Sequence, residues 1–161
     1  MDNDHGPSRR LDFGQRIYPM RVIGLGIGAL CVAAVLHEHR VAAWLWVVLA
    51  FDCLLWPHLA YLLVRRSREP VRVEYRNLMI DSAFGGFWIA VMAFDTLPSV
   101  LLAVMLTMDK VIVGGRRFGT KNLALMAVAC LATSAALGFP FEPYTSYRTM
   151  LACLPLLIVY P

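Results

Sequence analysis

The 161 residues suffice for one domain, but 59% of them are hydrophobic and 16% are charged, and the mean hydropathy is +0.62, which predicts a membrane protein. The formal net charge of +4 comes from Lys and Arg beside apolar segments, where membrane orientation and anionic lipid headgroups explain it better than nucleic acid does. The four cysteines stand singly and lack the spacing of zinc ligands, so we expect no disulfide framework, metal site or other cofactor.

Six apolar segments follow one another and predict an all-α bundle of six membrane spans, arranged as three helical hairpins. A polar cytoplasmic tail at 1–16 precedes them. The spans are expected at about residues 17–36, 41–64, 78–97, 98–113, 122–137 and 147–160. The first span follows arginines, as a signal sequence would, but it has no small-residue cleavage site at its end and more spans follow, so we expect it to be mature structure.

Lys and Arg are distributed unequally between the two sides of this predicted bundle. All of them except Arg40 and Arg148 fall on the side of the amino terminus. The positive-inside rule then predicts a multi-pass membrane protein with both termini in the cytoplasm. The loops are too short for an extracellular domain, so a signal would arrive through the bilayer, the bundle interior or the small outer loops. A lipophilic ligand is therefore a candidate partner.

Three spans carry small or polar residues at helical spacing. Gly24 and Gly28 lie one turn apart and permit close helix approach. This approach serves packing within the monomer, which we favour, or a dimer seam. One face of the third span is expected to point into the bundle, and one side of the fifth to pack closely. The face of the third span holds Asp81, Gly85, Trp88, Met92 and Asp95, and the side of the fifth span holds Ala124, Val128, Ala132 and Ala136.

Four ionisable residues lie at a similar predicted depth. Arg21, His58, Asp81 and Asp109 each sit about 6–9 Å inside the cytoplasmic end of a different span. A charge in lipid costs about 2.5–3.5 kcal/mol, so we expect Arg21 to pair with Asp81 or Asp109, with His58 in the same network. The alternatives are snorkelling for the two aspartates and a structural, hydrogen-bonded histidine beside the kink that Pro57 predicts.

Asp52 is different because it lies about 15 Å from either predicted membrane face. It must be protonated or held by donors at that depth, such as the Trp88 indole or the hydroxyls of Thr133 and Ser134. A small proton or ion transporter that uses Asp52 and Asp95 is the alternative function from another class.

Four sequence blocks resemble the second class of bacterial membrane-associated sensor domains. They are Arg-Ile-Tyr-Pro-Met-Arg-Val-Ile-Gly-Leu-Gly at 16–26, Trp-Pro-His-Leu-Ala-Tyr at 56–61, Asn-Leu-Met-Ile-Asp-Ser at 77–82 with Gly-Gly-Phe-Trp at 85–88, and Phe-Asp-Thr-Leu-Pro-Ser at 94–99. The resemblance implies a six-helix sensor domain that precedes a cytoplasmic nucleotide cyclase. Class III adenylate cyclase, which makes cAMP, is preferred over diguanylate cyclase, which makes cyclic di-GMP.

The resemblance also implies that this chain is the membrane half of the enzyme, without the catalytic domain that follows it. Class III cyclases form their active sites between two subunits, so a homodimer is expected. A change of helix packing around the four ionisable residues would then pass through the sixth span to the catalytic domains. A passive membrane anchor is the simpler alternative.

Overall fold

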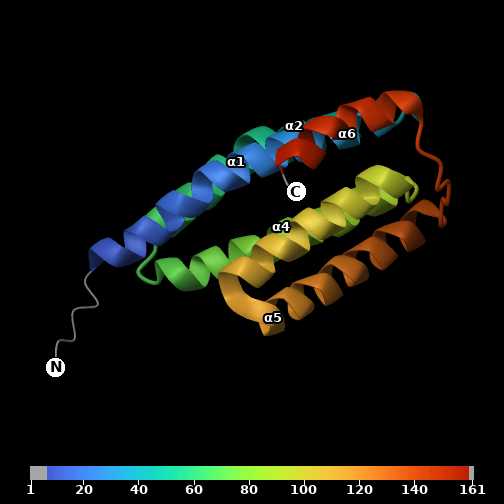
Figure 1. Cartoon of the computed structure of the whole chain (residues 1–161). Helices are drawn as coiled ribbons and strands as arrows, with labels where there is room; N and C mark the ends of the chain where they lie inside the picture. The colour runs from blue at the N-terminus through green and yellow to red at the C-terminus, as the bar shows by residue number, and fades with distance from the viewer. Residues whose placement is uncertain (1–6, 160–161) are drawn as a thin grey trace.

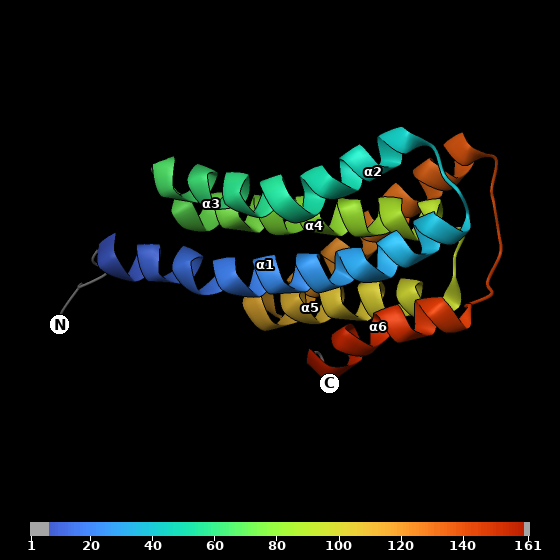
Figure 2. The same cartoon turned by 90° about the horizontal axis from the view of Figure 1, so that it is seen from above.

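The computed structural model is all α-helical, as predicted, and it describes residues 7–159, with side chains from residue 18 onward. The helices are α1 (Pro7–Glu38), α2 (Ala43–Ala50), α3 (Trp56–Arg66), α4 (Pro70–Val91), α5 (Thr96–Leu137) and α6 (Tyr147–Val159), with a π-helical segment η1 (Phe51–Leu55) between α2 and α3. Figure 1 shows α1, α2 and α6 on one side of the bundle and α4 and α5 on the other. The helices run up and down along a common direction (Figure 2).

Helix α1 is longer than the predicted first span. It begins at Pro7, so residues 7–16 of the predicted tail are helical, while residues 1–6 lie outside the described part of the chain. Pro19 lies inside α1 and leaves one intrahelical hydrogen bond unmade without ending the helix. The predicted span at 17–36 corresponds to the later part of this helix.

Segments α2, η1 and α3 form one continuous rod (Figure 2). Pro57 cannot donate a backbone hydrogen bond, and the backbone before it widens by one residue, so that the N–H of Trp56 donates to the carbonyl of Phe51. A π-helical turn is a common way to absorb such a local mismatch, and it often lies at functional sites. The predicted irregularity before His58 is therefore a π turn that contains Asp52.

The arginine-rich turn between α3 and α4 is shorter than predicted. We expected an irregular segment up to Asn77, but α4 begins at Pro70, a residue suited to the first helical position. Two polar residues in the early part of α4 are also buried: Glu74 is enclosed, and the amide of Asn77 donates to the carbonyl of Ala60 in α3 at 3.1 Å. These tertiary contacts keep the polar residues 70–77 helical.

Helix α5 reverses direction at Gly115 and has two arms, 96–114 and 116–137 (Figure 1). The expected basic loop at 114–121 is absent, because Gly115 alone breaks the helix, with φ 72° and ψ −179°. This backbone region is open almost only to glycine. A Cβ on Gly119 would lie 2.4 Å from Val111 Cγ2, so the two arms meet tightly just after the reversal.

Glycines on α4 let both arms of α5 approach closely. A Cβ on Gly85 would lie 2.2 Å from Leu106 Cδ1 of the first arm, and one on Gly86 would lie 2.1 Å from the Met126 carbonyl oxygen of the second. The predicted inward face of the third span is confirmed, since all five of its members are buried; three lie in α4, and Met92 and Asp95 follow its end. The five members are Asp81, Gly85, Trp88, Met92 and Asp95.

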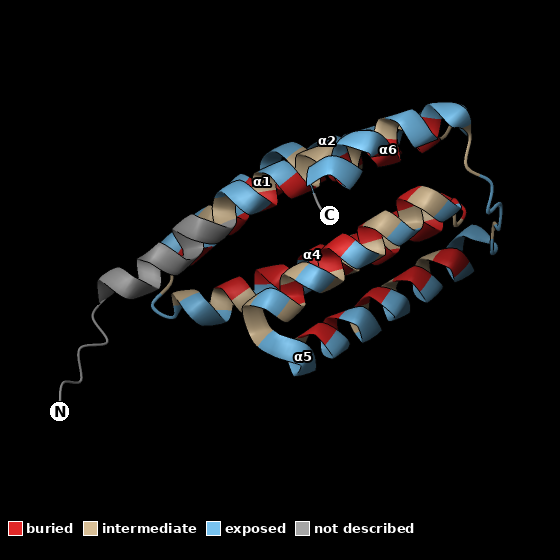
Figure 3. Cartoon of the chain, in the orientation of Figure 1, coloured by how far each residue is buried: buried red, intermediate tan, exposed pale blue. Residues whose placement is uncertain are grey.

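The prediction that the alanine-rich side of the second arm of α5 packs closely was wrong, because the arm is rotated about its axis so that other residues are buried. The arm buries Met126, Cys130 and two polar residues, Asn122 and Ser134, while the alanine-rich face is exposed (Figure 3). The physical reason is that Asn122 needs protein partners, and it is hydrogen-bonded to Ser82 of α4 and to the carbonyl of Phe118. Alanine has no polar group to satisfy and tolerates either environment.

Large apolar side chains cover the outside of the bundle, and Val47 and Ile112 are among the most exposed. Three segments are long and apolar enough to cross a membrane: Tyr18–Glu38, Ala43–Arg66 and Thr96–Leu137. Helix α4 carries Glu74, Arg76 and Asp81, and α6 is a shorter apolar helix whose predicted last residue, Tyr160, lies outside the described residues. The chain is thus a membrane helical bundle with three clear candidate spans.

Candidate functional site

A buried ion-pair cluster joins α1, α3 and α4 near the end of the bundle where α1 begins. The Arg21 guanidinium donates through Nε to Asp81 Oδ2 at 3.0 Å and through Nη2 to Glu74 Oε1 at 2.7 Å. The Trp56 indole donates to the other oxygen of Asp81 at 2.6 Å. Of the two partners predicted for Arg21, Asp81 is the one with which Arg21 forms an ion pair in the structure. Both oxygens of Asp81 are therefore bonded, as burial of a carboxylate requires.

Glu74 was not predicted as a member of this cluster. It lies seven residues before Asp81 on α4, and two helical turns place these carboxylates on one face. The sequence pattern does not reveal it because the expected third span begins at residue 78; extension of that span to Pro70 shows the spacing.

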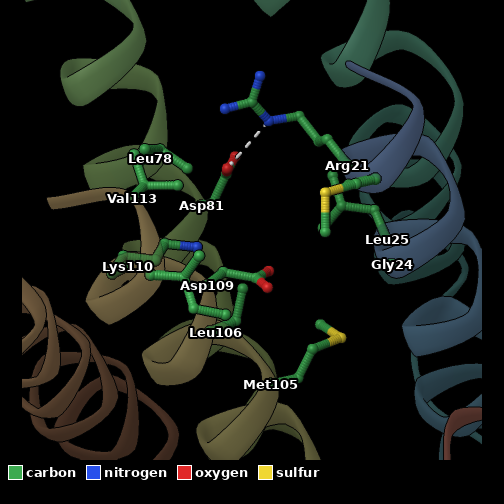
Figure 4. Close-up of a pocket in the computed structure, with 12 residues that line it drawn as sticks. Arg21, Gly24, Leu25, Leu78, Asp81, Met105, Leu106, Asp109, Lys110 and Val113 are labelled. Atoms are coloured by element: carbon green, nitrogen blue, oxygen red, sulfur yellow. Dashed lines mark hydrogen bonds and ion pairs between the residues drawn. The ribbon is translucent and has the colours of Figure 1, made fainter. Parts of the chain in front are cut away.

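Asp109 and Lys110 of the first arm of α5 approach the cluster from another side. With Arg21 and Asp81 they line a cavity of about 70 Å³. Figure 4 shows the Asp109 carboxyl group directed across this space toward α1, and the Arg21–Asp81 contact beyond it. Within the described residues Asp109 makes no ion pair with Arg21. Lys110, only 2% exposed, was not predicted, because a lysine near the end of a span is expected to snorkel.

His58 does not belong to the cluster, so this prediction was wrong. Its side chain is exposed and is hydrogen-bonded through Nδ1 to the Tyr18 hydroxyl at 2.7 Å, while the Tyr18 ring contacts the Tyr61 ring in a tilted arrangement. The buried side of α3 at this level carries Trp56 and Pro57. A helix turns about 100° per residue, which places His58 on the outer face. The geometry agrees with the alternative of a hydrogen-bonded structural histidine beside the Pro57 irregularity.

Asp52 lies beside Trp88, whose indole N–H donates to Asp52 Oδ2 at 2.8 Å. The other oxygen, Oδ1, is buried and has no hydrogen-bond partner among the described residues. Ser134, a second predicted donor, is buried and also lacks a partner within the described residues, and Thr133 is half-buried. Of the predicted donors, the Trp88 indole is thus the one seen to donate to Asp52.

Gly24 and Gly28 face the interior of the monomer. Gly24 lines the cavity beside Arg21. A Cβ on Gly28 would lie 3.2 Å from Leu102 Cδ2 and 3.8 Å from Met105 Cε, both on the first arm of α5. The contact is of the intramolecular kind that we favoured over a dimer seam.

Polar contacts at the opposite end of the bundle attach α6 to its neighbours. The Thr145 hydroxyl donates to Asp95 Oδ1 and accepts from the N–H of Leu97 at 3.1 Å, and the Ser146 hydroxyl donates to Glu38 at the end of α1. Asp95 therefore serves the turn before α5 and is separate from Asp52. Among the described residues no three His, Cys, Asp or Glu side chains could together hold a metal ion.

The MASE2 domain family matches residues 16–106. The chain belongs to the MASE2 family. The matched region contains Arg21, Trp56, Glu74 and Asp81, the whole ion-pair cluster of the MASE2 domain, and it ends shortly before Asp109. This family is the sensor-domain class that the sequence blocks resemble.

Two curated relatives resemble this MASE2 domain along almost all of its length. Both are described as probable diguanylate cyclase DgcC, one from Escherichia coli (strain K12) and one from Escherichia coli O6:H1. Each is 31% identical over 159 residues, which is 99% of this chain and 43% of the relative. The chain thus spans less than half the length of these relatives. No solved structure matches it.

Proposed function

We propose that this MASE2 domain is the membrane-embedded regulatory and dimerising part of a diguanylate cyclase in the bacterial inner membrane. The observation that carries the proposal is the similarity over 99% of the chain to proteins described as probable diguanylate cyclases, of which more than half lies outside the match. This similarity favours the alternative, a diguanylate cyclase that makes cyclic di-GMP, over the adenylate cyclase that the sequence analysis prefers. The catalytic domain would be the part of the full protein that this chain does not contain.

We further propose that all six apolar segments span the membrane, with both termini in the cytoplasm. Two features support this topology. Gly115 divides α5 into two arms, each long enough to cross a bilayer. Two carboxylates of α4, those of Glu74 and Asp81, are paired with Arg21 of α1, which lowers the cost of placing that helix in lipid.

The proposed regulation runs through α1, because α1 contacts both the ion-pair cluster and α6. Arg21 pairs with Glu74 and Asp81 of α4. Ten residues later, Cys31 Sγ lies 3.8 Å from the carbonyl oxygen of Ala152 on α6, and Glu38 bonds to Ser146. A change in the pairing of Arg21 would shift α1 and with it α6, which leads toward the carboxyl terminus. Such a change alters the relative placement of two catalytic domains in a dimer.

The test uses the full protein, chain and native output domain, in vesicles. Cyclic di-GMP made from GTP and cAMP made from ATP are both measured, for the wild type and for Arg21→Met. The matched control is Arg68→Met, since Arg68 is exposed in the α3–α4 turn. We expect cyclic di-GMP as the product and an altered rate for Arg21→Met only. Synthesis of cAMP alone would contradict the proposed output.

Passive anchoring is tested by exchange of the domain. An unrelated six-span bundle in its place would leave activity and its response to conditions unchanged if the MASE2 domain only anchors and pairs the enzyme. Loss of the response with retained dimerisation would support regulation.

A further inference from the structure

The cavity beside the ion-pair cluster has an apolar wall and a polar end. Its wall comes from α1, α4 and the first arm of α5, with Leu78, Met105 and Leu106 among its apolar residues. Its polar end is formed by Asp109 and Lys110 next to the Arg21–Asp81 contact (Figure 4). A small apolar pocket with few convergent polar groups is the usual form of a ligand site.

Two polar groups that line the cavity, on Asp109 and Lys110 of α5, are available to a ligand. Both oxygens of Asp81 are taken by Arg21 and Trp56. Lys110 and Asp109, in contrast, form no hydrogen bond or ion pair with any side chain that the structure describes. Lys110 is 2% exposed and Asp109 is half-buried, and a charged group taken from water without a partner is costly. The cavity therefore presents one strong donor, the Lys110 amine, and one strong acceptor, the Asp109 carboxylate.

We propose that this cavity binds the hydroxyl head group of an uncharged, membrane-dissolved amphiphile. A hydroxyl group is at once a donor and an acceptor, so it can donate to Asp109 and accept from Lys110. The proposal rests on the proposed regulatory function and deepens it, since it names the class of ligand.

The charges of the cluster favour a neutral head group. Two cations, Arg21 and Lys110, stand against three carboxylates, Glu74, Asp81 and Asp109. An anionic head group would add a fourth negative charge in a medium of low dielectric constant. An ammonium head group would offset the excess negative charge, but it has no acceptor for the Lys110 amine. A hydroxyl group adds neither charge.

The size of the cavity indicates how the rest of the molecule would lie. Its volume of about 70 Å³ is about half that of the roughly 150 Å³ cavity that holds benzene in an engineered protein. It accepts a head group and the first carbons of a chain. Met20 and Ile112, which also line it, are 57% and 75% exposed, so the alkyl tail would leave between α1 and α5 into the lipid.

Photoaffinity labelling of the purified chain in lipid nanodiscs tests the site. The probe is decan-1-ol with a diazirine near the hydroxyl end and a terminal alkyne, and the labelled residues are mapped by mass spectrometry. The matched pair of variants is Gly24→Leu, which fills the cavity, and Gly26→Leu, whose added Cβ would meet nothing within 4 Å. Lys110→Met is a second variant, which removes the donor without filling the space.

We expect labels on residues 20–25 and 105–113, displaced by decan-1-ol but not by decane or decanoate. Lys110→Met should lower labelling about tenfold, as for the loss of a hydrogen bond to a charged group. Gly24→Leu should also lower it, because its side chain takes the space of the ligand, and Gly26→Leu should not. Equal labelling of all variants, or equal displacement by decane or decanoate, would overturn the site. Binding is measured here without any cyclase, so a bound probe with no effect on the full enzyme would count against the proposed function and leave the site standing.

Discussion

Arg21 and Asp81 are 60 residues apart in sequence, and their side chains meet at 3.0 Å, each 4% exposed. The contact joins the first long helix to α4, and Glu74 and Trp56 complete it. Within a membrane neither partner would have water to replace the other, so the pair fixes how α1 lies against α4. The proposed regulation depends on this relationship.

Removal of Arg21 alone should cost more stability than removal of the whole cluster. Arg21→Met leaves Glu74 and Asp81 buried without a counter-charge, and we expect a loss of about 3–5 kcal/mol in the free energy of unfolding. Adding Glu74→Gln and Asp81→Asn should recover part of it. The measurement is unfolding of the purified domain in mixed micelles. The control is Arg72→Met, since Arg72 pairs with Glu69 in an exposed position and should cost less than about 1 kcal/mol. Equal losses for Arg21→Met and Arg72→Met would contradict the prediction.

Trp88→Phe should destabilise the domain through Asp52. The substitution removes the indole donor at 2.8 Å and leaves a buried carboxyl group without a partner, for an expected loss of about 1–3 kcal/mol. In an Asp52→Leu background the same substitution should cost less, because no acceptor remains. Trp44→Phe is the matched control, since Trp44 is 54% exposed. Thermal unfolding followed by circular dichroism measures all four variants, and identical effects of Trp88→Phe in both backgrounds would argue against this contact.

Gly86→Ala should separate α4 from the second arm of α5. The new Cβ would lie 2.1 Å from the Met126 carbonyl oxygen, and backbone must move to relieve the overlap, for an expected loss of about 1–3 kcal/mol. Gly26→Ala, in open space on α1, should be neutral or slightly stabilising because alanine favours helix. The same unfolding measurement compares them. Unchanged stability of Gly86→Ala would show that the helices are not in such close contact.

The six-span topology predicts opposite labelling of two introduced cysteines. Ser67→Cys lies in the α3–α4 turn and Tyr144→Cys in the loop before α6. With both termini in the cytoplasm, a membrane-impermeant maleimide should label Tyr144→Cys in intact cells and Ser67→Cys only in inverted vesicles. The parent protein should have its four native cysteines replaced by alanine or serine. Labelling of both positions from the same side would contradict the topology.

Composition and periodicity by themselves determined the class of this protein. An apolar chain with flanking arginines must cross or enter a bilayer as helices, because backbone groups in lipid require internal hydrogen bonds. The helical spacing of Asp81, Gly85, Trp88, Met92 and Asp95 was enough to identify the buried face of α4, since this periodicity is local. The sequence blocks likewise led to the family that matches residues 16–106.

Rotation and register of the helices were decided only by tertiary structure. One residue of helical rotation separates a buried Pro57 from an exposed His58, and depth along a span carries no information about that angle. The start of α4 at Pro70 likewise depends on contacts from other helices, which bring Glu74 to the cluster. Depth is a one-dimensional property that the sequence contains, whereas the choice of partners around an axis results from how all the helices pack together.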